Sequence, residues 1–179
     1  EPIGAIHGLA PERVIYAGSA SKTLAPGLRL GWMIVPHPHV EQLGAIKEAN
    51  DRGSPVLDQL AFADFLSKGE FDRHLRRMRP LYRERRDALL HALRRHLPKA
   101  RTTGASAGLH VLALLPRGVD EGAVLEEAAA AGVKVTGLSH TYHDPPRAPA
   151  GLIFGYGQVA APKIEEGVRV VASAVDALR

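Results

Sequence analysis

A long helical pattern in the middle of the chain constrains its fold more than any other feature. Apolar side chains recur at helical spacing across this segment, at Phe71, Leu75, Met78, Tyr82, Leu89, Leu93 and Leu97. Nine arginines lie between Arg73 and Arg95 and fall largely off the apolar stripe. We interpret them as the solvated face of a helix rather than as a nucleic-acid surface. The start of this helix places a domain boundary near residue 70.

The segments before this helix alternate between strand-like and helical patterns. Short apolar, β-branched runs at 13–17 and 30–36 predict two strands. Helical patterns follow the second run at about 38–50 and again from Val56 to a stop near Gly69. We therefore expect a mixed layer of strands and helices before residue 70.

The segments after the long helix predict a smaller α+β part. Strand-like runs occupy 108–116, 133–137 and 151–157, and 120–132 predicts a helix with acidic residues in its first turn. The chain closes on an amphipathic helix whose buried stripe is Ile164, Val168, Val171, Val175 and Leu178. The expected fold class is α/β.

Composition excludes several kinds of chemistry. The 179 residues contain no cysteine, which removes disulfides, thiolate metal sites and cysteine nucleophiles. No apolar run approaches the roughly 18 residues of a membrane span, and we expect a cytoplasmic protein. The pairs His37/His39 and His140/His143 have no convergent carboxylates in the sequence, so we expect no metal site.

The stretch GSASKTLAPGLRLGW, from Gly18 to Trp32, carries the densest chemical signal. Lys22 lies among three hydroxyl side chains, and Arg29 follows seven residues later. An arginine offers a planar, permanently charged fork that suits phosphate. A lysine amine can attack a carbonyl when it is partly deprotonated, which burial and neighbouring cations promote.

One phosphorylated aldehyde would use both halves of this stretch. Pyridoxal phosphate would place its aldehyde carbon on Lys22 and its phosphate on Ser19 and Arg29. The same short pattern also occurs in ordinary surface loops, so residue types alone leave both interpretations open.

The sequence resembles fold-type-I pyridoxal-phosphate proteins of the aminotransferase class I/II superfamily. Within it, the chain is most similar to the aminotransferase-like domain of MocR-type regulators, a GntR subfamily. The resemblance covers essentially the whole chain. The blocks that carry it are RVIYAGSASKTLAPGLRLGWMIVP, LDQLAFADFLSKGEFDRHLRRMRPLYRERRDAL, AGLHVLALLP and GLIFGYG.

The resemblance implies roles for residues of the lysine stretch. Lys22 would form the internal aldimine with pyridoxal 5'-phosphate. Ser19 and Arg29 would hold the phosphate, with Ser21 as a further phosphate candidate and Thr23 as a support of the turn.

A true aminotransferase of the aminoadipate type, acting on an amino acid and a 2-oxo acid, is the alternative. Such enzymes usually carry a Gly-Gly-Met-Phe-like segment where this chain has 106–111, and a Pro-Gly-rich loop where it has 135–143. They also place a carboxylate-binding arginine before the late strand, and we align that position with Leu152. Leucine cannot pair with a carboxylate. The departures favour the regulator, and net transamination stays an open question.

The loop 137–151 supplies the other candidate ligand groups. His140 and Arg147 are the nearby cationic side chains, and the resemblance implies that this loop borders the effector pocket. The expected ligand is an amino acid or another small molecule with an amino group, which would exchange with Lys22 by transaldimination.

The resemblance also implies how the chain is organised. Residues 1–70 would be the C-terminal part of a large, mainly parallel-sheet domain, and 71–179 would be the long helix and small C-terminal subdomain. We expect the chain to be a C-terminal fragment of a homodimeric regulator that contacts DNA only through an absent N-terminal winged helix-turn-helix domain. A domain that keeps the fold only as a dimerisation scaffold, without cofactor, is a further alternative.

Overall fold

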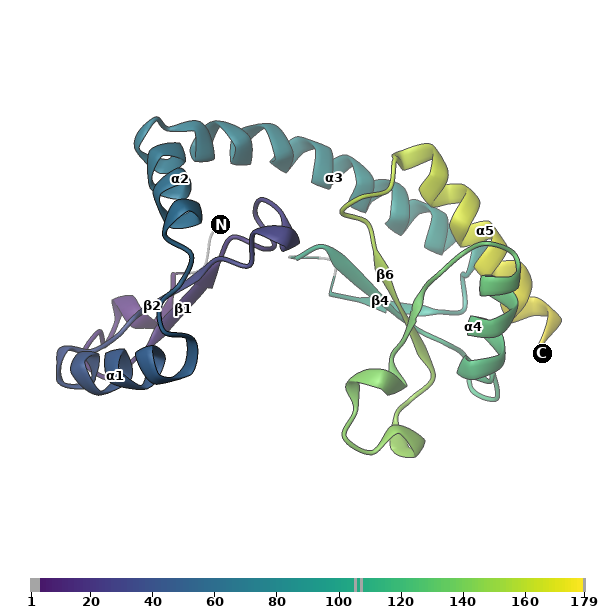
Figure 1. The fold of residues 1–179 in the computed structure, drawn as a ribbon. Coiled ribbons are helices and arrows are strands. Elements are labelled where there is room, and N and C mark those ends of the chain that lie inside the picture. The colour runs from purple at the N-terminus through teal and green to yellow at the C-terminus, as the bar shows by residue number, and fades with distance from the viewer. Residues whose placement is uncertain (1–3, 105, 107, 179) are drawn as a thin grey trace. The chain divides into compact units, whose positions relative to one another are not determined.

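The computed structural model describes residues 4–104, 106 and 108–178. The chain divides into two compact units, Glu1–Arg76 and Arg77–Arg179, which we describe one at a time (Figure 1). Helix α3, Glu70–His96, begins in the first unit and ends in the second. This division lies near the predicted boundary at residue 70, and the assignment of the two parts to domains stays a prediction.

The first unit contains one strand pair and two short helices besides the start of α3. Strand β1, Tyr16–Ser19, pairs antiparallel with β2, Gly31–Ile34, so that Tyr16 is opposite Ile34 and Ser19 opposite Gly31. The remaining elements are η1 (Ile6–Gly8), η2 (Pro26–Leu28), η3 (His37–His39), α1 (Val40–Asp51) and α2 (Val56–Ser67). The helices predicted before residue 70 are present.

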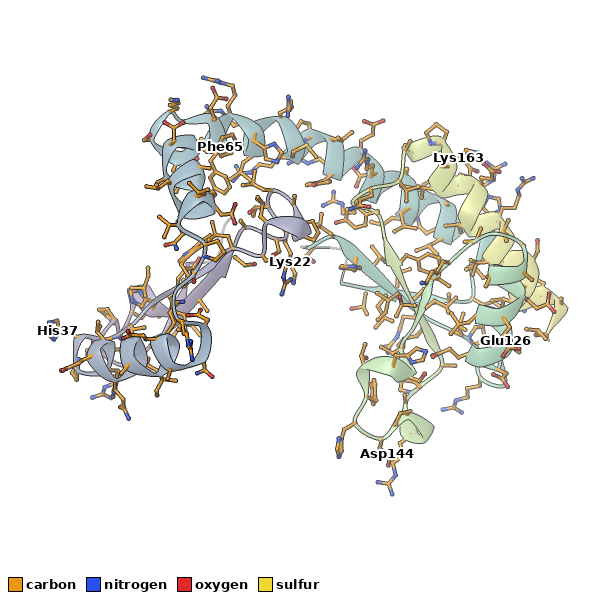
Figure 2. The ribbon with its side chains drawn as sticks, in the orientation of Figure 1. Lys22, His37, Phe65, Glu126, Asp144 and Lys163 are labelled. Carbon is orange, nitrogen blue, oxygen red and sulfur yellow. The ribbon has the colours of Figure 1, made fainter. Side chains whose placement is uncertain are left out.

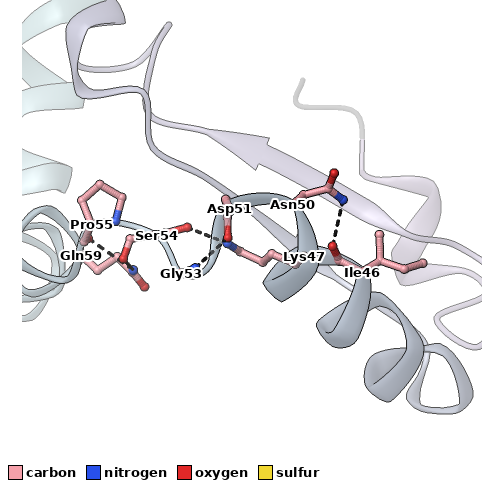
Figure 3. A network of polar contacts seen from close by, with 8 residues as sticks. All are labelled: Ile46, Lys47, Asn50, Asp51, Gly53, Ser54, Pro55 and Gln59. Atoms are coloured by element: carbon pink, nitrogen blue, oxygen red, sulfur yellow. Dashed lines mark hydrogen bonds and ion pairs between the residues drawn. The ribbon is translucent and has the colours of Figure 1, made fainter.

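The turn between α1 and α2 is fixed by a polar network (Figure 3). Lys47 Nζ donates hydrogen bonds to Asp51 Oδ2 at 2.6 Å and to Ser54 Oγ at 2.7 Å. The amide of Gly53 donates to Asp51 Oδ1 at 2.9 Å. The hydrogen bond from Lys47, followed by the one from Gly53, lowers the pKa of Asp51 below its usual value.

Aromatic side chains connect the strand pair to the helices of the first unit. The ring of Trp32 on β2 stacks on Phe62 of α2 with centroids 6.0 Å apart. Phe71 in the first turn of α3 meets both Phe62 and Phe65 edge-on, at 5.8 and 6.4 Å. These contacts hold α2 and the first turn of α3 against β2.

The second unit is an antiparallel sheet packed with helices. Its strand order is β3-β4-β6-β5, with β3 at Arg101–Thr103, β4 at His110–Leu114, β5 at Thr136–Gly137 and β6 at Gly151–Gly155. Its helices after α3 are α4 (Glu121–Ala130), η4 (Ser139–Thr141), η5 (Pro145–Arg147) and α5 (Ala161–Ala177). Asp120 caps α4, because its Oδ1 accepts a hydrogen bond from the amide of Ala123 at 3.2 Å.

One apolar core holds the second unit together. Buried side chains come from the last turns of α3, from alternate positions of β4 and β6, and from one stripe each of α4 and α5. The fully buried members with the largest side chains are Leu89, Leu93, Val111, Val124, Leu152, Val168, Val171 and Val175. Four of the five residues predicted for the stripe of α5 are buried, and Leu178 packs against the core at its edge.

The strand ladders of the described residues are all antiparallel. We expected a mainly parallel sheet for the large domain. The described residues of the first unit contain one strand pair, β1 and β2, and it is antiparallel. Among the described helices, none combines the length and apolar character that a membrane crossing requires.

Candidate cofactor site

Lys22 lies on a tight turn that directly follows β1. Ala20 is fully buried, and both its amide and its carbonyl group make hydrogen bonds that hold this turn. Its amide donates to the carbonyl of Leu30 at 2.9 Å, and its own carbonyl accepts from the amides of Thr23 at 3.2 Å and Leu24 at 2.8 Å. The backbone around Lys22 is therefore fixed, while the Lys22 side chain is exposed and projects from the loop (Figure 2).

The strand register explains why a glycine precedes the serines. Gly18 is opposite Trp32, and a Cβ at position 18 would lie 2.5 Å from the indole ring. A Cβ on Gly31 would lie 3.0 Å from the carbonyl oxygen of Gly18. The two glycines allow β1 and β2 to approach closely under the Trp32 ring, and this sets the position of Ser19 at the end of β1.

Arg29 has a constrained backbone. It ends η2 with φ 49° and ψ 23°, in the left-handed region that glycine favours. Its side chain is exposed. A non-glycine residue in this conformation costs about 1 kcal/mol or more.

The predicted site residues fit a phosphorylated aldehyde. Within the described part of the chain, the side chains of Lys22, Ser19, Ser21 and Arg29 make no hydrogen bond or ion pair. An amine, two hydroxyls and a guanidinium are thus carried, with their donors free, by one segment that runs from the end of β1 to the end of η2. This donor set is what a ligand with an aldehyde carbon and a phosphate group requires.

His74 is a residue of this region that sequence reasoning missed. Its Nε2 lies 3.0 Å from the carbonyl oxygen of Thr23, the residue after Lys22. A carbonyl oxygen only accepts, so Nε2 carries the proton and donates. Thr23 Oγ1 also donates weakly to the carbonyl of Ala20 at 3.4 Å, in line with a supporting role in the turn. The sequence pattern makes His74 an ordinary residue of the long helix, because it holds no signal for a contact across 51 positions.

His140 and Arg147 lie in the second unit, on the loop between β5 and β6. His140 is in η4 and Arg147 in η5, and both side chains are exposed. Arg147 Nε forms an ion pair with Asp144 Oδ2 at 3.1 Å, at the tip of the loop (Figure 2). The Arg147 side chain is 86% exposed, so this ion pair is weak and leaves most of its donors free.

Leu152, the position that we aligned with a carboxylate-binding arginine, is a core residue of the second unit. It is fully buried, opposite Ala113 on β4 and Gly137 on β5. Whether a leucine here separates a regulator from an enzyme stays a prediction. In the segment 106–111, Ala107 lies outside the described residues, and the carbonyl of Gly108 accepts a hydrogen bond from Tyr156 Oη at 2.6 Å.

Known regulators and aminotransferases are similar to the chain over nearly its whole length. The chain is 36% identical over 180 residues to the "Probable rhizopine catabolism regulatory protein MocR" of Rhizobium meliloti, covering 99% of this chain and 36% of that protein. It is 35% identical over 179 residues to "Aromatic-amino-acid aminotransferase 1" of Thermococcus litoralis, covering 98% of this chain and 42% of that protein. No family model matches the chain.

A solved structure shows the same fold. LysN, the α-aminoadipate aminotransferase of Thermus thermophilus, superimposes with a TM-score of 0.85 at 33% identity, over 97% of this chain and 44% of that one. Its crystal structure contains N-(5'-phosphopyridoxyl)-L-leucine, an adduct of the cofactor. The chain spans less than half the length of each of these relatives.

The chain thus has the fold of type I pyridoxal-phosphate-dependent transferases, as expected, and pyridoxal phosphate is the cofactor of this class. It belongs to the aminotransferase-like domain that MocR-type regulators of the GntR family share with class I/II aminotransferases.

Proposed function

We propose that this chain is part of the pyridoxal-phosphate-binding, effector-sensing domain of a MocR-type transcriptional regulator. The observation that carries this proposal is the segment 19–29, from the end of β1 to the end of η2, which carries the free amine of Lys22 and the free donors of Ser19, Ser21 and Arg29. The similarity to MocR over 99% of the chain supports a regulator as the parent protein.

The residues of the turn would hold the cofactor at both ends. Pyridoxal phosphate supplies an aldehyde carbon that condenses reversibly with a primary amine. Lys22 Nζ provides that amine from a backbone that is already fixed. Arg29 provides a charged fork and Ser19 and Ser21 provide hydroxyls for the phosphate, and charge-assisted hydrogen bonds of this kind are the strong ones.

The effector would be a small molecule with an amino group that competes with Lys22 for the cofactor's aldehyde carbon. His140 and Arg147 are our candidates for binding an anionic group of that molecule, because both are exposed and Arg147 is permanently charged. We further propose that the parent protein is a homodimer that contacts DNA through a separate helix-turn-helix domain. The effector would change DNA affinity by preferring one of two conformations.

An aminotransferase is the second candidate, because aminotransferases also match over nearly the whole chain. The two functions differ in what happens after the amino group of an amino acid takes the place of the Lys22 amine on the cofactor. A regulator needs only a change in conformation, whereas an aminotransferase must release a 2-oxo acid and repeat the cycle.

One experiment separates them. Full-length protein loaded with pyridoxal phosphate is titrated with a panel of amino acids that includes L-2-aminoadipate and L-leucine. Cofactor absorption, affinity for DNA from upstream of its own gene, and 2-oxo acid release are measured together. A regulator changes its absorption and shifts its DNA affinity by about 5- to 150-fold, with no repeated release of 2-oxo acid. Many turnovers without DNA binding would establish the aminotransferase instead.

A further inference from the structure

The carboxylate of Glu121 connects helix α4 to both ends of the loop 138–151. Glu121 lies in the first turn of α4 and is partly buried. Its Oε1 accepts hydrogen bonds from the amide and the hydroxyl of Ser139, at 3.1 and 2.6 Å. Its Oε2 accepts from the amide of Gly151 at 2.8 Å. One charged group thus satisfies three donors, two at the start of the loop and one at its end.

The base of the loop is closed around this carboxylate. The amide of Leu138 donates to the carbonyl of Gly151 at 2.8 Å, so the two ends of the loop are bound to each other as well as to Glu121. Leu138 is buried, and a Cβ on Gly151 would lie only 3.0 Å from its Cδ2. The ends of the loop are therefore tightly packed.

Gly137 provides the space that the carboxylate occupies. A Cβ at position 137 would overlap Glu121 Oε1 and would lie 2.9 Å from both Glu121 Cδ and Leu125 Cδ1. Gly137 is itself buried in β5. Glycine at this position is thus explained by the carboxylate beside it rather than by backbone conformation.

Beyond its base, the loop depends on short-range contacts. Thr141 Oγ1 donates to the carbonyl of Leu138 at 2.8 Å, and the amide of Arg147 donates to the carbonyl of Asp144 at 3.1 Å. Among the described side chains of 140–150, no hydrogen bond or ion pair reaches the helices or β4. The described side chains of the loop are therefore held by local contacts, and Glu121 joins the two ends of the loop to α4.

We propose that Glu121 is a positioning residue that clamps both ends of the loop 138–151 and thereby orients His140 and Arg147. The clamp follows from the contacts of Glu121 alone. Its effect on a ligand rests on the proposed function, in which this loop borders the effector.

Hydrogen exchange tests the clamp without any ligand. In full-length, cofactor-loaded protein, Glu121→Gln keeps the size of the side chain, but its NH₂ group cannot accept a hydrogen bond. Because the remaining amide oxygen of the glutamine still accepts, we expect the backbone amide left facing the NH₂ group, that of Ser139 or that of Gly151, to exchange at least about tenfold faster, the loss expected for a hydrogen bond to a charged group. Core amides such as that of Val171 should exchange at an unchanged rate, which separates a local clamp from a general loss of stability.

Glu126→Gln is the matched control, because Glu126 is an exposed glutamate on the same helix (Figure 2). It removes the same charge and should leave the loop amides unchanged. Gly137→Ala is an independent variant that displaces the whole carboxylate without altering it, and it should speed exchange at both Ser139 and Gly151. Unchanged exchange at both amides in Glu121→Gln and in Gly137→Ala would overturn the clamp.

The effect on ligand binding uses L-2-aminoadipate as the probe and cofactor absorption as the readout. Glu121→Gln should weaken the apparent affinity for the probe several-fold, while the affinity for pyridoxal phosphate stays that of the wild type. Faster exchange with unchanged probe affinity would overturn the link between the clamp and the effector. A wild type that does not respond to the probe or to the wider amino-acid panel would count against the proposed function, while the exchange data still decide the clamp.

Discussion

The imidazole of His74 donates a hydrogen bond to the carbonyl oxygen of Thr23, the residue that follows Lys22. This contact ties the first turns of α3 to the turn that carries the lysine. It adds to the backbone hydrogen bonds of Ala20, so the turn is held both from Leu30, the residue before β2, and from α3. A histidine 51 positions from Thr23 in the sequence thus takes part in fixing the backbone next to Lys22.

Replacing His74 should loosen this turn. His74→Ala removes a hydrogen bond whose net value is about 1 kcal/mol, and we expect pyridoxal phosphate to bind about fivefold more weakly. A titration followed by cofactor absorption measures this in the full-length protein. His37→Ala is the control, because the exposed side chain of His37 makes no hydrogen bond or ion pair among the described residues. Equal cofactor affinity in both variants would show that His74 does not contribute to cofactor binding.

Arg29 allows a test in which the backbone is controlled. Arg29 and Arg52 are the described non-glycine residues with positive φ, at 49° and 51°. Glycine at either position relieves the same backbone strain, so both variants should keep or slightly raise stability, by up to about 1 kcal/mol. Arg29→Gly should bind pyridoxal phosphate at least about tenfold more weakly, because a charge-assisted contact to phosphate is lost.

Arg52→Gly should bind the cofactor like the wild type. The comparison of the two glycine variants isolates the guanidinium from the conformation of the chain. Indistinguishable cofactor affinities would exclude Arg29 from the phosphate site.

Leu152 should behave as a core residue and not as a ligand contact. Leu152→Ala should lower the free energy of unfolding by about 2–5 kcal/mol, measured by urea denaturation. Leu152→Arg would bury an unpaired charge and should prevent the second unit from folding. A folded Leu152→Arg protein with tighter binding of L-2-aminoadipate would restore this position as a carboxylate site.

The ion pairs between α3 and α5 predict a dependence of stability on pH. Glu165 accepts from His96 Nε2 at 3.2 Å and pairs with Arg95 Nη1 at 3.2 Å. The hydrogen bond from His96, opposed in part by desolvation, lowers the pKa of Glu165 below its ordinary value. A carboxyl group whose pKa is lower in the folded than in the unfolded protein stabilises the fold at pH values above its ordinary pKa. This stabilisation is lost as the pH falls through the lowered pKa.

Urea midpoints of full-length protein measured between about pH 6 and 3 test this prediction. Glu165→Gln should reduce the fall in stability on the acid side, whereas Glu127→Gln, an exposed glutamate of α4, should retain it. The same acid profile in wild type and Glu165→Gln would show that the pair contributes nothing.

The helices could be predicted because their pattern repeats over many residues. The buried stripe of α5 and the course of α3 follow from apolar spacing alone. Strands were harder to place. The first predicted strand, at 13–17, lies instead at Tyr16–Ser19, where pairing with β2 decides its limits. Strand β3 was missed because Arg101–Thr103 is polar and becomes a strand only by pairing with Leu112–Leu114 of β4.

Some residues of the candidate site could be predicted from the sequence and others could not. Lys22, Ser19, Ser21 and Arg29 were predicted because they are close in sequence and form a recognisable motif. His74 and Glu121 could not be predicted, because each acts through a contact with a segment at least 18 positions away. The burial of Leu152 could not be predicted either, because the sequence does not tell which side of a strand faces the core.

The central claim is that Lys22 forms the covalent bond to the cofactor, and it can be tested directly. Full-length protein is incubated with pyridoxal phosphate, reduced with borohydride and digested, and the modified peptide is sequenced by mass spectrometry. We expect the phosphopyridoxyl group on Lys22 of the wild type and its absence from Lys22→Ala, with Lys47→Ala modified like the wild type. A phosphopyridoxyl group fixed on another residue of the wild type, or retained in Lys22→Ala, would contradict the assignment.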